Sequence, residues 1–304
     1  MRLLTVALML LAGCDGGNKV PPREFDGVSA LRYVETQLAF GPRIPGREGH
    51  ERTAAWLDSL LHARADTVLV QRWVHRTAAG DSLRLTNFIA RFKPAAATRL
   101  LFLAHWDTRP RADGPMSRDS TLPVPGANDG ASGVALLLGV ADALKQLPPG
   151  IGVDLLFVDG EDYGDFNSDQ DVLLGSRYYA EHQAPGPQPR FAVLFDMIGD
   201  KDLRIPQEGL SLVAAPDVVE LVWSLADRIG HGEVFVREEQ GGLTDDHVPL
   251  QRAGIRAIDL IDFTFGGPDN RWHHTPDDTI DKVSSASLQV VGDLALALVR
   301  VTKP

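Results

Sequence analysis

Hydrophobic and polar positions follow two periods along the chain, and these periods predict an ordered series of strands and helices. Uninterrupted apolar runs at residues 100–104, 153–158 and 191–195 are typical of strands buried on both faces of a sheet. A fourth run, at 257–261, is similar but contains an aspartate, Asp259. Apolar residues three and four positions apart predict helices at 29–39, 50–63, 131–146, 175–183, 217–230 and 284–302.

Two further segments, 68–74 and 84–92, have the pattern of strands and are expected to form a hairpin. A glycine- and proline-rich loop at 41–46 separates the first two helices. Alternation of strands and helices predicts an α/β fold. We expect a three-layer α/β/α sandwich with a mostly parallel, mixed central sheet.

The first residues have the pattern of an export signal. After Arg2, residues 3–12 are apolar except for Thr5, and this run is too short to cross a bilayer as a helix. It ends in Leu-Ala-Gly-Cys at Cys14, which resembles a bacterial lipobox and predicts acylation of the thiol. The alternatives are a secretory signal with a chance cysteine, or a buried apolar strand. We expect a signal peptide at 1–14, a tether at 15–25 and a single catalytic domain at 26–304.

Composition limits the classes of partner. The chain has 304 residues, of which 44% are hydrophobic and 23% are charged, as in a globular protein. Its net charge is −11 and it has no basic stripe, which argues against nucleic acid as a partner. Cys14 is the only cysteine, so the rest of the chain has no disulfide and no thiolate ligand. The lipobox predicts an exported lipoprotein of the bacterial cell envelope, anchored by lipid on the periplasmic side of a membrane.

Ionisable side chains follow three of the predicted buried strands. His105 follows the first run, Glu161 and Asp162 follow the second, and Asp196 follows the third. Because ligands of open α/β sheets bind at the carboxyl ends of strands, we expect these side chains at one edge. Asp129 stands just before a predicted helix, and His274 comes late in the chain.

The residue types indicate a metal centre. Zinc and similar divalent ions prefer imidazole and carboxylate ligands, which are supplied by His105, Asp129, Asp162, Asp196 and His274. Burying several carboxylates without a cation would cost several kcal/mol each, on the order of the desolvation penalty of an ion. Glu161 beside Asp162 could leave one carboxylate on the metal and one free to move protons.

Each residue alone has a simpler interpretation. Asp129 could cap the following helix, His105 could be a satisfied core histidine, and Asp196 could close a turn. Glu161 and Asp162 could be a solvated pair, and His273 and His274 could be exposed. Only their joint placement at strand ends favours the metal centre.

Six motifs in order resemble metallopeptidase family twenty-eight (M28), which contains zinc aminopeptidases and zinc-dependent glutaminyl cyclases. The resemblance covers roughly residues 30–302 and is nearest to the bacterial cyclase branch. The motifs are His105-Trp-Asp-Thr, Gly126-Ala-Asn-Asp-Gly-Ala-Ser-Gly, Asp159-Gly-Glu-Asp, Phe195-Asp-Met-Ile-Gly, Asp245-Asp-His and His274-Thr-Pro-Asp-Asp-Thr.

The resemblance implies ligands for one zinc ion: Asp129, Asp162 and His274. In the two-zinc aminopeptidases, Asp129 would bridge both ions, and His105 with Asp196 would hold the second. One ion is our expectation and two is the alternative. Asp162 stands where the family often has glutamate.

The resemblance also implies catalytic roles. Glu161 matches the general acid and base, and Asp246 matches a carboxylate of a proton-relay network that also includes Asp196. The usual Trp-His-Thr is one residue longer here, so His274, directly before a threonine, is the expected ligand and His273 the alternative. Trp272 could supply an aromatic wall for the substrate.

The expected function is conversion of N-terminal glutamine to pyroglutamate on peptides or proteins, with release of ammonia. The acidic pair Asp245-Asp246 and the segment from His105 to Asp113 favour the cyclase branch of the family. The alternatives are a zinc aminopeptidase and an inactive peptide-binding lipoprotein. Intact Glu161 argues against the last, since binding alone does not need a free carboxylate beside the metal.

Overall fold

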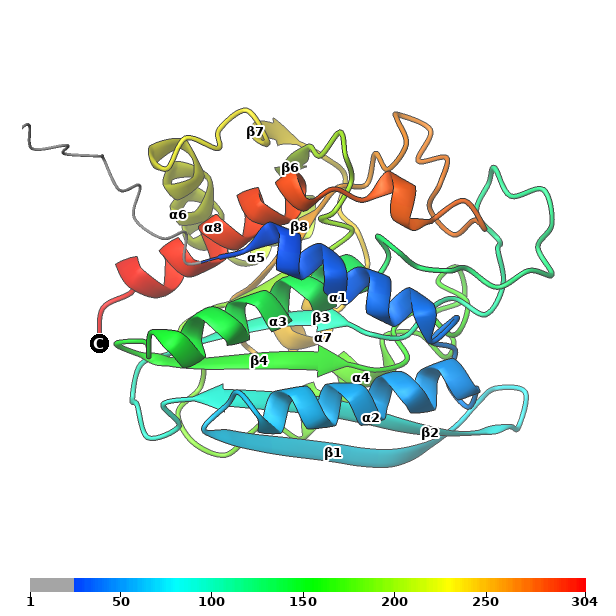
Figure 1. Cartoon of the computed structure of the whole chain (residues 1–304), viewed down its shortest axis with the longest axis horizontal. Helices are drawn as coiled ribbons and strands as arrows, with labels where there is room; N and C mark the ends of the chain where they lie inside the picture. The colour runs from blue at the N-terminus through cyan, green and yellow to red at the C-terminus, as the bar shows by residue number, and fades with distance from the viewer. Residues whose placement is uncertain (1–24) are drawn as a thin grey trace, which may run out of the picture.

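A computed structural model describes residues 25–304, which form a six-stranded mixed sheet flanked by helices. The strand order is β1-β2-β4-β3-β5-β8. Strands β4, β3, β5 and β8 are parallel, and β1 and β2 run antiparallel at one edge (Figure 1). The strand bounds are β1 Thr67–Arg76, β2 Ser82–Phe92, β3 Arg99–His105, β4 Gly152–Val158, β5 Ala192–Asp196 and β8 Ala257–Ile261. The predicted sandwich, hairpin and mostly parallel sheet are confirmed.

Helices cover both faces of the sheet. Helices α1, α3 and α8 pack against one another over one face, and α2 covers β1 and β2 (Figure 1). Helices α4 and α7 contact each other over the opposite face. The bounds are α1 Gly27–Ala39, α2 Glu48–His62, α3 Ala131–Gln146, α4 Leu174–Glu181, α6 Pro216–Arg228, α7 His247–Arg252 and α8 Ser285–Val301.

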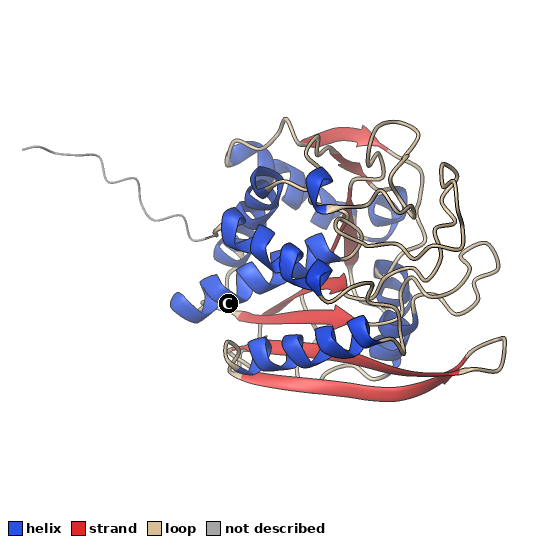
Figure 2. Cartoon of the chain, turned by 45° about the vertical axis from the view of Figure 1, so that its right-hand side comes forward, coloured by secondary structure: helices blue, strands red, loops and turns tan. Residues whose placement is uncertain are grey.

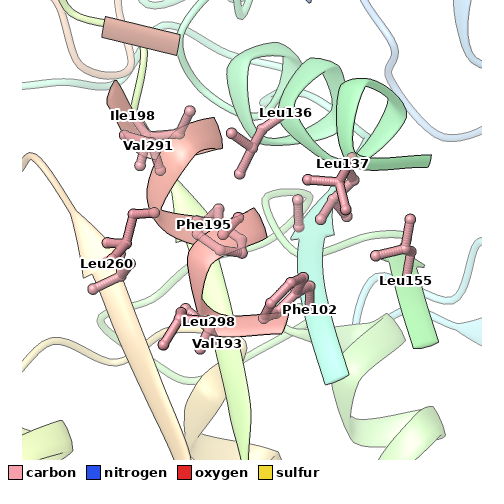
Figure 3. Packing of buried hydrophobic residues seen from close by; sticks show 14 of the residues in the cluster. Phe102, Leu136, Leu137, Leu155, Val193, Phe195, Ile198, Leu260, Val291 and Leu298 are labelled. Atoms are coloured by element: carbon pink, nitrogen blue, oxygen red, sulfur yellow. The ribbon is translucent and has the colours of Figure 1, made fainter. Parts of the chain in front are cut away.

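The buried strands serve two cores because successive side chains point to opposite faces of a strand. In β3, Leu100 and Phe102 join the larger core, and Leu101 and Leu103 join the smaller one. Figure 3 shows Phe102 packed with side chains of α3 and α8 above the sheet. This two-sided burial explains why the central strands are uninterrupted apolar runs in the sequence.

Phe25, the first described residue and the last of the predicted tether, packs in the core. Phe25 is fully buried, and its ring fills the space beside Gly139 of α3 and Gly292 of α8. A Cβ added at Gly292 would lie 2.3 Å from this ring. The predicted tether is therefore one residue too long, because Phe25 belongs to the core.

The predicted signal peptide and Cys14 lie outside the described residues. Acylation of Cys14 therefore stays a prediction. Within residues 25–304, no helix combines the length and apolar character needed to cross a membrane.

Several short elements were not expected from the sequence pattern. They are β6 Ile205–Gln207, α5 Gly209–Ala214, β7 Phe235–Glu239 and the 3-10 helix Ile280–Lys282, together with α7. Strands β6 and β7 pair in a separate two-stranded sheet. Elements of three to six residues are too short to display a period.

The long loops gather at one side of the molecule. Figure 2 shows them beside the ends of the central strands, to the right of the sheet. The long loops follow β3, β4 and β8, and the predicted site residues lie in them, at the end of β5 and just before α7.

Candidate active site

Three parallel strands bring the predicted residues to one edge. His105 ends β3 and Asp196 ends β5, and the two strands pair in parallel. Glu161 and Asp162 follow β4 after a turn at Gly160, whose φ of +69° favours glycine. The carboxylate of Asp107 accepts the backbone N–H groups of Glu161 and Asp162, each at 3.1 Å, and so fixes this turn.

The carboxylate of Asp129 is not used to bind the backbone N–H groups before α3, because Asp278 accepts them. Asp278 accepts the N–H groups of Asn128 at 2.8 Å and Asp129 at 3.1 Å. The N-cap of α3 is Gly130, and no side chain caps this helix. The alternative that Asp129 serves as a helix cap is therefore wrong.

The first group of donors contains Asp129, Asp162 and His274. Nε2 of His274 lies 3.5 Å from Oδ2 of Asp129 and 3.2 Å from Oδ1 of Asp162. A tetrahedral zinc ion with bonds of about 2.1 Å would separate its ligand atoms by roughly 3.4 Å. Oδ2 of Asp129 and Oδ2 of Asp162 are buried without a hydrogen-bond partner. His274 is therefore at ligand spacing from both carboxylates, whereas the donor atoms that all lie within 4.8 Å of one another belong to Asp129, His273 and His274. The donor types and the unpaired oxygens fit a divalent metal ion.

His273 forms one compact group of possible metal ligands with Asp129 and His274. Its Nε2 is 3.9 Å from Oδ2 of Asp129, and its ring stacks on His274 at 3.6 Å between centroids. Burial lowers the pKa of His273 to about 3. His274 faces both acidic residues whereas His273 faces only Asp129, which favours His274 as the ligand.

The second group of donors shares Asp129. Nε2 of His105 lies 3.1 Å from Oδ1 of Asp129 and 3.2 Å from Oδ1 of Asp196. His105 has a side chain exposed by only 1%, and its Nδ1 has no hydrogen-bond partner. The structure thus brings all five predicted ligands together, in two groups that meet at the two oxygens of Asp129.

Glu161 lies beside both groups. Oε2 of Glu161 is 3.7 Å from Nδ1 of His105. Burial raises the pKa of Glu161 well above its ordinary value, and the charges of Asp162 and Asp245 raise it further. Glu161 is therefore a buried carboxyl group that can accept and return a proton, rather than half of a solvated pair.

The site opens into a cavity of about 690 Å³, within the range of small-ligand pockets. Asp129, Glu161, Asp196, His273 and His274 lie in its floor and walls. The rest of the lining is mixed: it includes the apolar side chains of Phe166, Leu243, Ile261 and Phe263 and polar ones such as Arg109, Asp113 and Asp245. Such a cavity can hold a short side chain against the metal-binding groups.

Trp272 is not among the residues that line this cavity, and its role as an aromatic wall stays a prediction. Its ring packs edge-on against Phe265 at 5.3 Å between centroids, in an apolar cluster that also contains the cavity-lining residues Leu243, Ile261 and Phe263. Because His273 is inserted between Trp272 and His274, His273 takes the position next to the ligand. The aromatic walls are Phe166 and Phe263.

Asp245 and Asp246, the two adjacent aspartates before α7, lie in different environments. Asp245 lines the cavity, whereas the fully buried Asp246 accepts a hydrogen bond from Ser176. Burial raises the pKa of Asp246 to about 7, and burial likewise raises the pKa of Asp245. The carboxylate that the cavity presents to a ligand is that of Asp245, which sequence reasoning passed over in favour of its neighbour.

Comparisons with known proteins agree with this geometry. A family model described as peptidase family M28 matches residues 87–299. The solved glutaminyl cyclase of Bacteroides thetaiotaomicron, bound to N-acetylhistamine, is 36% identical with a TM-score of 0.86. That alignment covers 92% of this chain and 99% of the other.

Two curated relatives differ in activity. Aminopeptidase YwaD of Bacillus subtilis is 32% identical over 191 residues, which cover 60% of this chain but only 38% of YwaD. The glutaminyl-peptide cyclotransferase of Bos taurus is 28% identical over 280 residues, covering 81% of this chain and 74% of its own length. The family match spans more than half of the chain and contains every predicted metal ligand. The chain therefore belongs to peptidase family M28.

Proposed function

We propose that this protein is a zinc-dependent glutaminyl-peptide cyclotransferase. It would convert N-terminal glutamine of peptides or proteins to pyroglutamate and release ammonia. The observation that carries this proposal is the likeness to a solved glutaminyl cyclase along almost the full length of both chains. The small, partly apolar cavity beside Glu161 suits the side chain of one N-terminal residue.

Asp129, Asp162 and His274 would hold the zinc ion. When bound, zinc acts as a Lewis acid that polarises a carbonyl group. Nε2 of His274 lies within 3.5 Å of both carboxylates, and each carboxylate has a buried oxygen without a hydrogen-bond partner. One ion is proposed, and the group of His105, Asp129 and Asp196 is the place for a second.

Glu161 would move the protons of the reaction. The α-amine attacks the side-chain amide carbon, so a C–N bond forms to the α-nitrogen and the bond to the amide nitrogen breaks. Glu161 accepts a proton from the attacking amine and returns it to the departing nitrogen, which leaves as ammonia. Its position at the cavity, beside but outside both donor groups, supports this role.

The carboxylates around Glu161 would complete the relay. Asp196 and Asp245 both line the cavity, and the buried Asp246 accepts a hydrogen bond from Ser176. Asp245 has the better position to accept a hydrogen bond from the substrate amine. Asp246 would act through its neighbours. The apolar walls would enclose the methylene groups of the glutamine side chain and exclude water from the reacting carbon.

A direct assay separates cyclisation from hydrolysis. Purified zinc-loaded protein is incubated with a Gln-initiated peptide and, separately, with a Leu-initiated peptide of the same remaining sequence. Mass spectrometry should show loss of ammonia from the first peptide and no free leucine from the second. Rapid release of leucine without pyroglutamyl product would assign the protein to the aminopeptidases.

The aminopeptidase is the second candidate because of a specific observation. The second donor group, with His105 Nε2 within 3.2 Å of two carboxylates, could hold the second metal that hydrolysis commonly uses. Similarity to YwaD also supports it. Two zinc ions per chain together with leucine release would favour this candidate.

We also propose that the protein is exported and lipid-anchored through Cys14. The lipobox-like sequence at the end of the apolar run supports this. Anchoring on the periplasmic side of a membrane would give the cavity access to peptides of the cell envelope.

A further inference from the structure

Arg109 joins two acidic side chains beside the proposed zinc centre. Four residues beyond the end of β3, it is buried, and its Nη1 donates to Oδ1 of Asp162 at 2.9 Å and to the carbonyl oxygen of Asp162 at 3.1 Å. Its Nε and Nη2 donate to the two carboxylate oxygens of Asp113, at 2.6 and 2.8 Å. A planar guanidinium is suited to such a bridge because its donors have a fixed geometry.

Asp113 extends this bridge to the proposed histidine ligand. Oδ1 of Asp113 lies 3.6 Å from Nδ1 of His274, whereas Nε2 of the same ring faces Asp129 and Asp162. The neighbouring Gly114 donates its N–H to the carbonyl oxygen of His274 at 3.0 Å. A Cβ at Gly114 would lie 2.2 Å from the carbonyl oxygen of His273, so the two loops meet backbone to backbone.

We infer that Arg109 and Asp113 are positioning residues that hold Asp162 and His274 in the geometry for zinc. The inference rests on the proposed zinc centre. Metal-ligating histidines commonly present their second ring nitrogen to a carboxylate, and ligating carboxylates are themselves hydrogen-bonded. Here one pair of residues serves both ligands. The pair also links segments that are 53 residues apart, at Arg109 and Asp162.

Whether the removal of Arg109 weakens or strengthens zinc binding depends on whether the charge of Arg109 is neutralised. A lone guanidinium beside a ligand would repel a metal cation, and its removal would strengthen metal binding. Asp113 binds Arg109 through both oxygens, so the pair carries no net charge. Repulsion is therefore small, and the loss of ligand orientation on removing Arg109 should dominate.

The Arg109–Asp113 contact adds little to folding, whereas the Arg109–Asp162 contact is buried and fixes the carboxylate of Asp162. The side chain of Asp113 is 44% exposed, and ion pairs with an exposed partner contribute only about 0–1 kcal/mol to folding. Arg109 donates hydrogen bonds to the carboxylate of Asp113 and to both the carboxylate and the carbonyl oxygen of Asp162. A role in holding metal ligands explains this arrangement.

The test is zinc affinity without substrate, measured by competition with a chromophoric chelator. Arg109→Met and Asp113→Asn should each bind zinc about 10- to 100-fold more weakly than the native protein, as for other residues that support metal ligands. Arg109→Lys keeps the charge but loses the fork, so its affinity should also remain below native. The visible absorption of the Co²⁺-substituted protein should change in the same variants, since it reports the ligand geometry.

Arg111→Met is the matched control, because it removes the same charge from an exposed position on the same loop. Its zinc affinity and Co²⁺ spectrum should stay native. Far-ultraviolet circular dichroism checks folding, and the partly exposed Asp113→Asn serves if Arg109→Met does not fold.

Three results contradict the inference. Unchanged affinity and spectrum in Arg109→Met and Asp113→Asn would reduce the pair to a surface contact. Tighter binding in Arg109→Met would make Arg109 a competing cation. Absence of zinc binding by the native protein would overturn the proposed zinc centre and this inference together, which the native measurement reveals before any variant is compared.

Discussion

Asp129 is the residue on which both possible metal stoichiometries depend. Its Oδ1 faces His105 and its Oδ2 faces His274, at 3.1 and 3.5 Å. Burial opposes its ionisation, but the hydrogen bond from His105 and the nearby histidines hold the pKa of Asp129 below its ordinary value. It is thus a carboxylate ready for a cation on either side.

Replacing Glu161 tests proton transfer separately from metal binding. Glu161→Gln keeps the shape of the side chain but cannot accept a proton. Turnover of a Gln-initiated peptide should fall by roughly 10²–10⁴-fold, the usual contribution of general acid–base catalysis. Zinc content, measured by atomic emission, should stay native. Loss of zinc together with activity would show instead that Glu161 is a ligand.

The two adjacent histidines can be distinguished by metal binding. His274→Ala removes the ring that faces Asp129 and Asp162, so zinc affinity should fall by more than about 100-fold, beyond the effect of a supporting residue. His273→Ala is the control, since its ring faces only Asp129 at 3.9 Å, and it should keep most of its affinity. The reverse order of affinities would make His273 the ligand.

At the scale of elements, the loops around the site are held in place by buried acidic residues that accept hydrogen bonds from backbone N–H groups. Glu208 shows how a distant loop is tied to the cavity. Its carboxylate accepts the N–H of Leu210 at 2.7 Å and of Ser211 at 2.6 Å, which caps helix α5. It also accepts the N–H of Leu243, a residue of the cavity wall, at 2.8 Å.

Glu208→Gln should destabilise the fold in a pH-dependent way. Burial would raise the pKa of Glu208, but contact with His247 and the hydrogen bonds hold it at about 2, below its ordinary value of 4.5. Because the folded pKa is lower than the unfolded one, the charge stabilises the fold at neutral pH. This stabilisation is lost as pH falls from 4.5 to about 2.

Urea unfolding of native protein and variant gives the measurement. At pH 7 the variant should lose about 1–3 kcal/mol, the cost of an impaired buried acceptor. The difference between native and variant should shrink below pH 4.5. Glu35→Gln, on the exposed face of α1, is the control and should change little. A difference that stays constant with pH would mean that the charge of Glu208 is not what stabilises the loop.

At the scale of the whole molecule, one face carries the chemistry and the N-terminus carries the predicted anchor. The cavity is lined by the loops after β3, β4 and β8, by Asp196 at the end of β5 and by the segment before α7. Figure 2 shows these loops gathered on one side of the molecule. The net charge of −11 gives no electrostatic attraction to anionic lipid headgroups, so membrane association would depend on acylation.

Cys14→Ser tests this anchor. Acyl chains contribute about 0.8 kcal/mol for each buried methylene, so two or three chains hold a protein firmly to a membrane. The native protein should fractionate with membranes and carry lipid by mass spectrometry, and the variant should lack the lipid and leave the membrane fraction or fail to be processed. A native protein that is wholly soluble and free of lipid would end this proposal.

Local periodicity was sufficient for the architecture and for much of the site. Buried strands are apolar runs because both of their faces are covered, and helices have apolar stripes because one face is covered. The predicted strand ends therefore placed His105, Glu161, Asp162 and Asp196 at one edge before any contact was known. The elements that the pattern missed, such as β6 and α5, have too few residues to show a period.

Tertiary contacts decided the rest, because they join residues that are far apart in sequence. Phe25 belongs to the core since it fills the space left by glycines of α3 and α8. The ring of Trp272 packs against Phe265, and Trp272 is not among the residues that line the cavity. The way the chain enters α7 decides that Asp245, rather than Asp246, lines the cavity. The hydrogen bond from Arg109 to Asp162 forms because two strand-end loops lie side by side. A sequence pattern reports which face of its own element a residue occupies, but not which distant side chain meets it there.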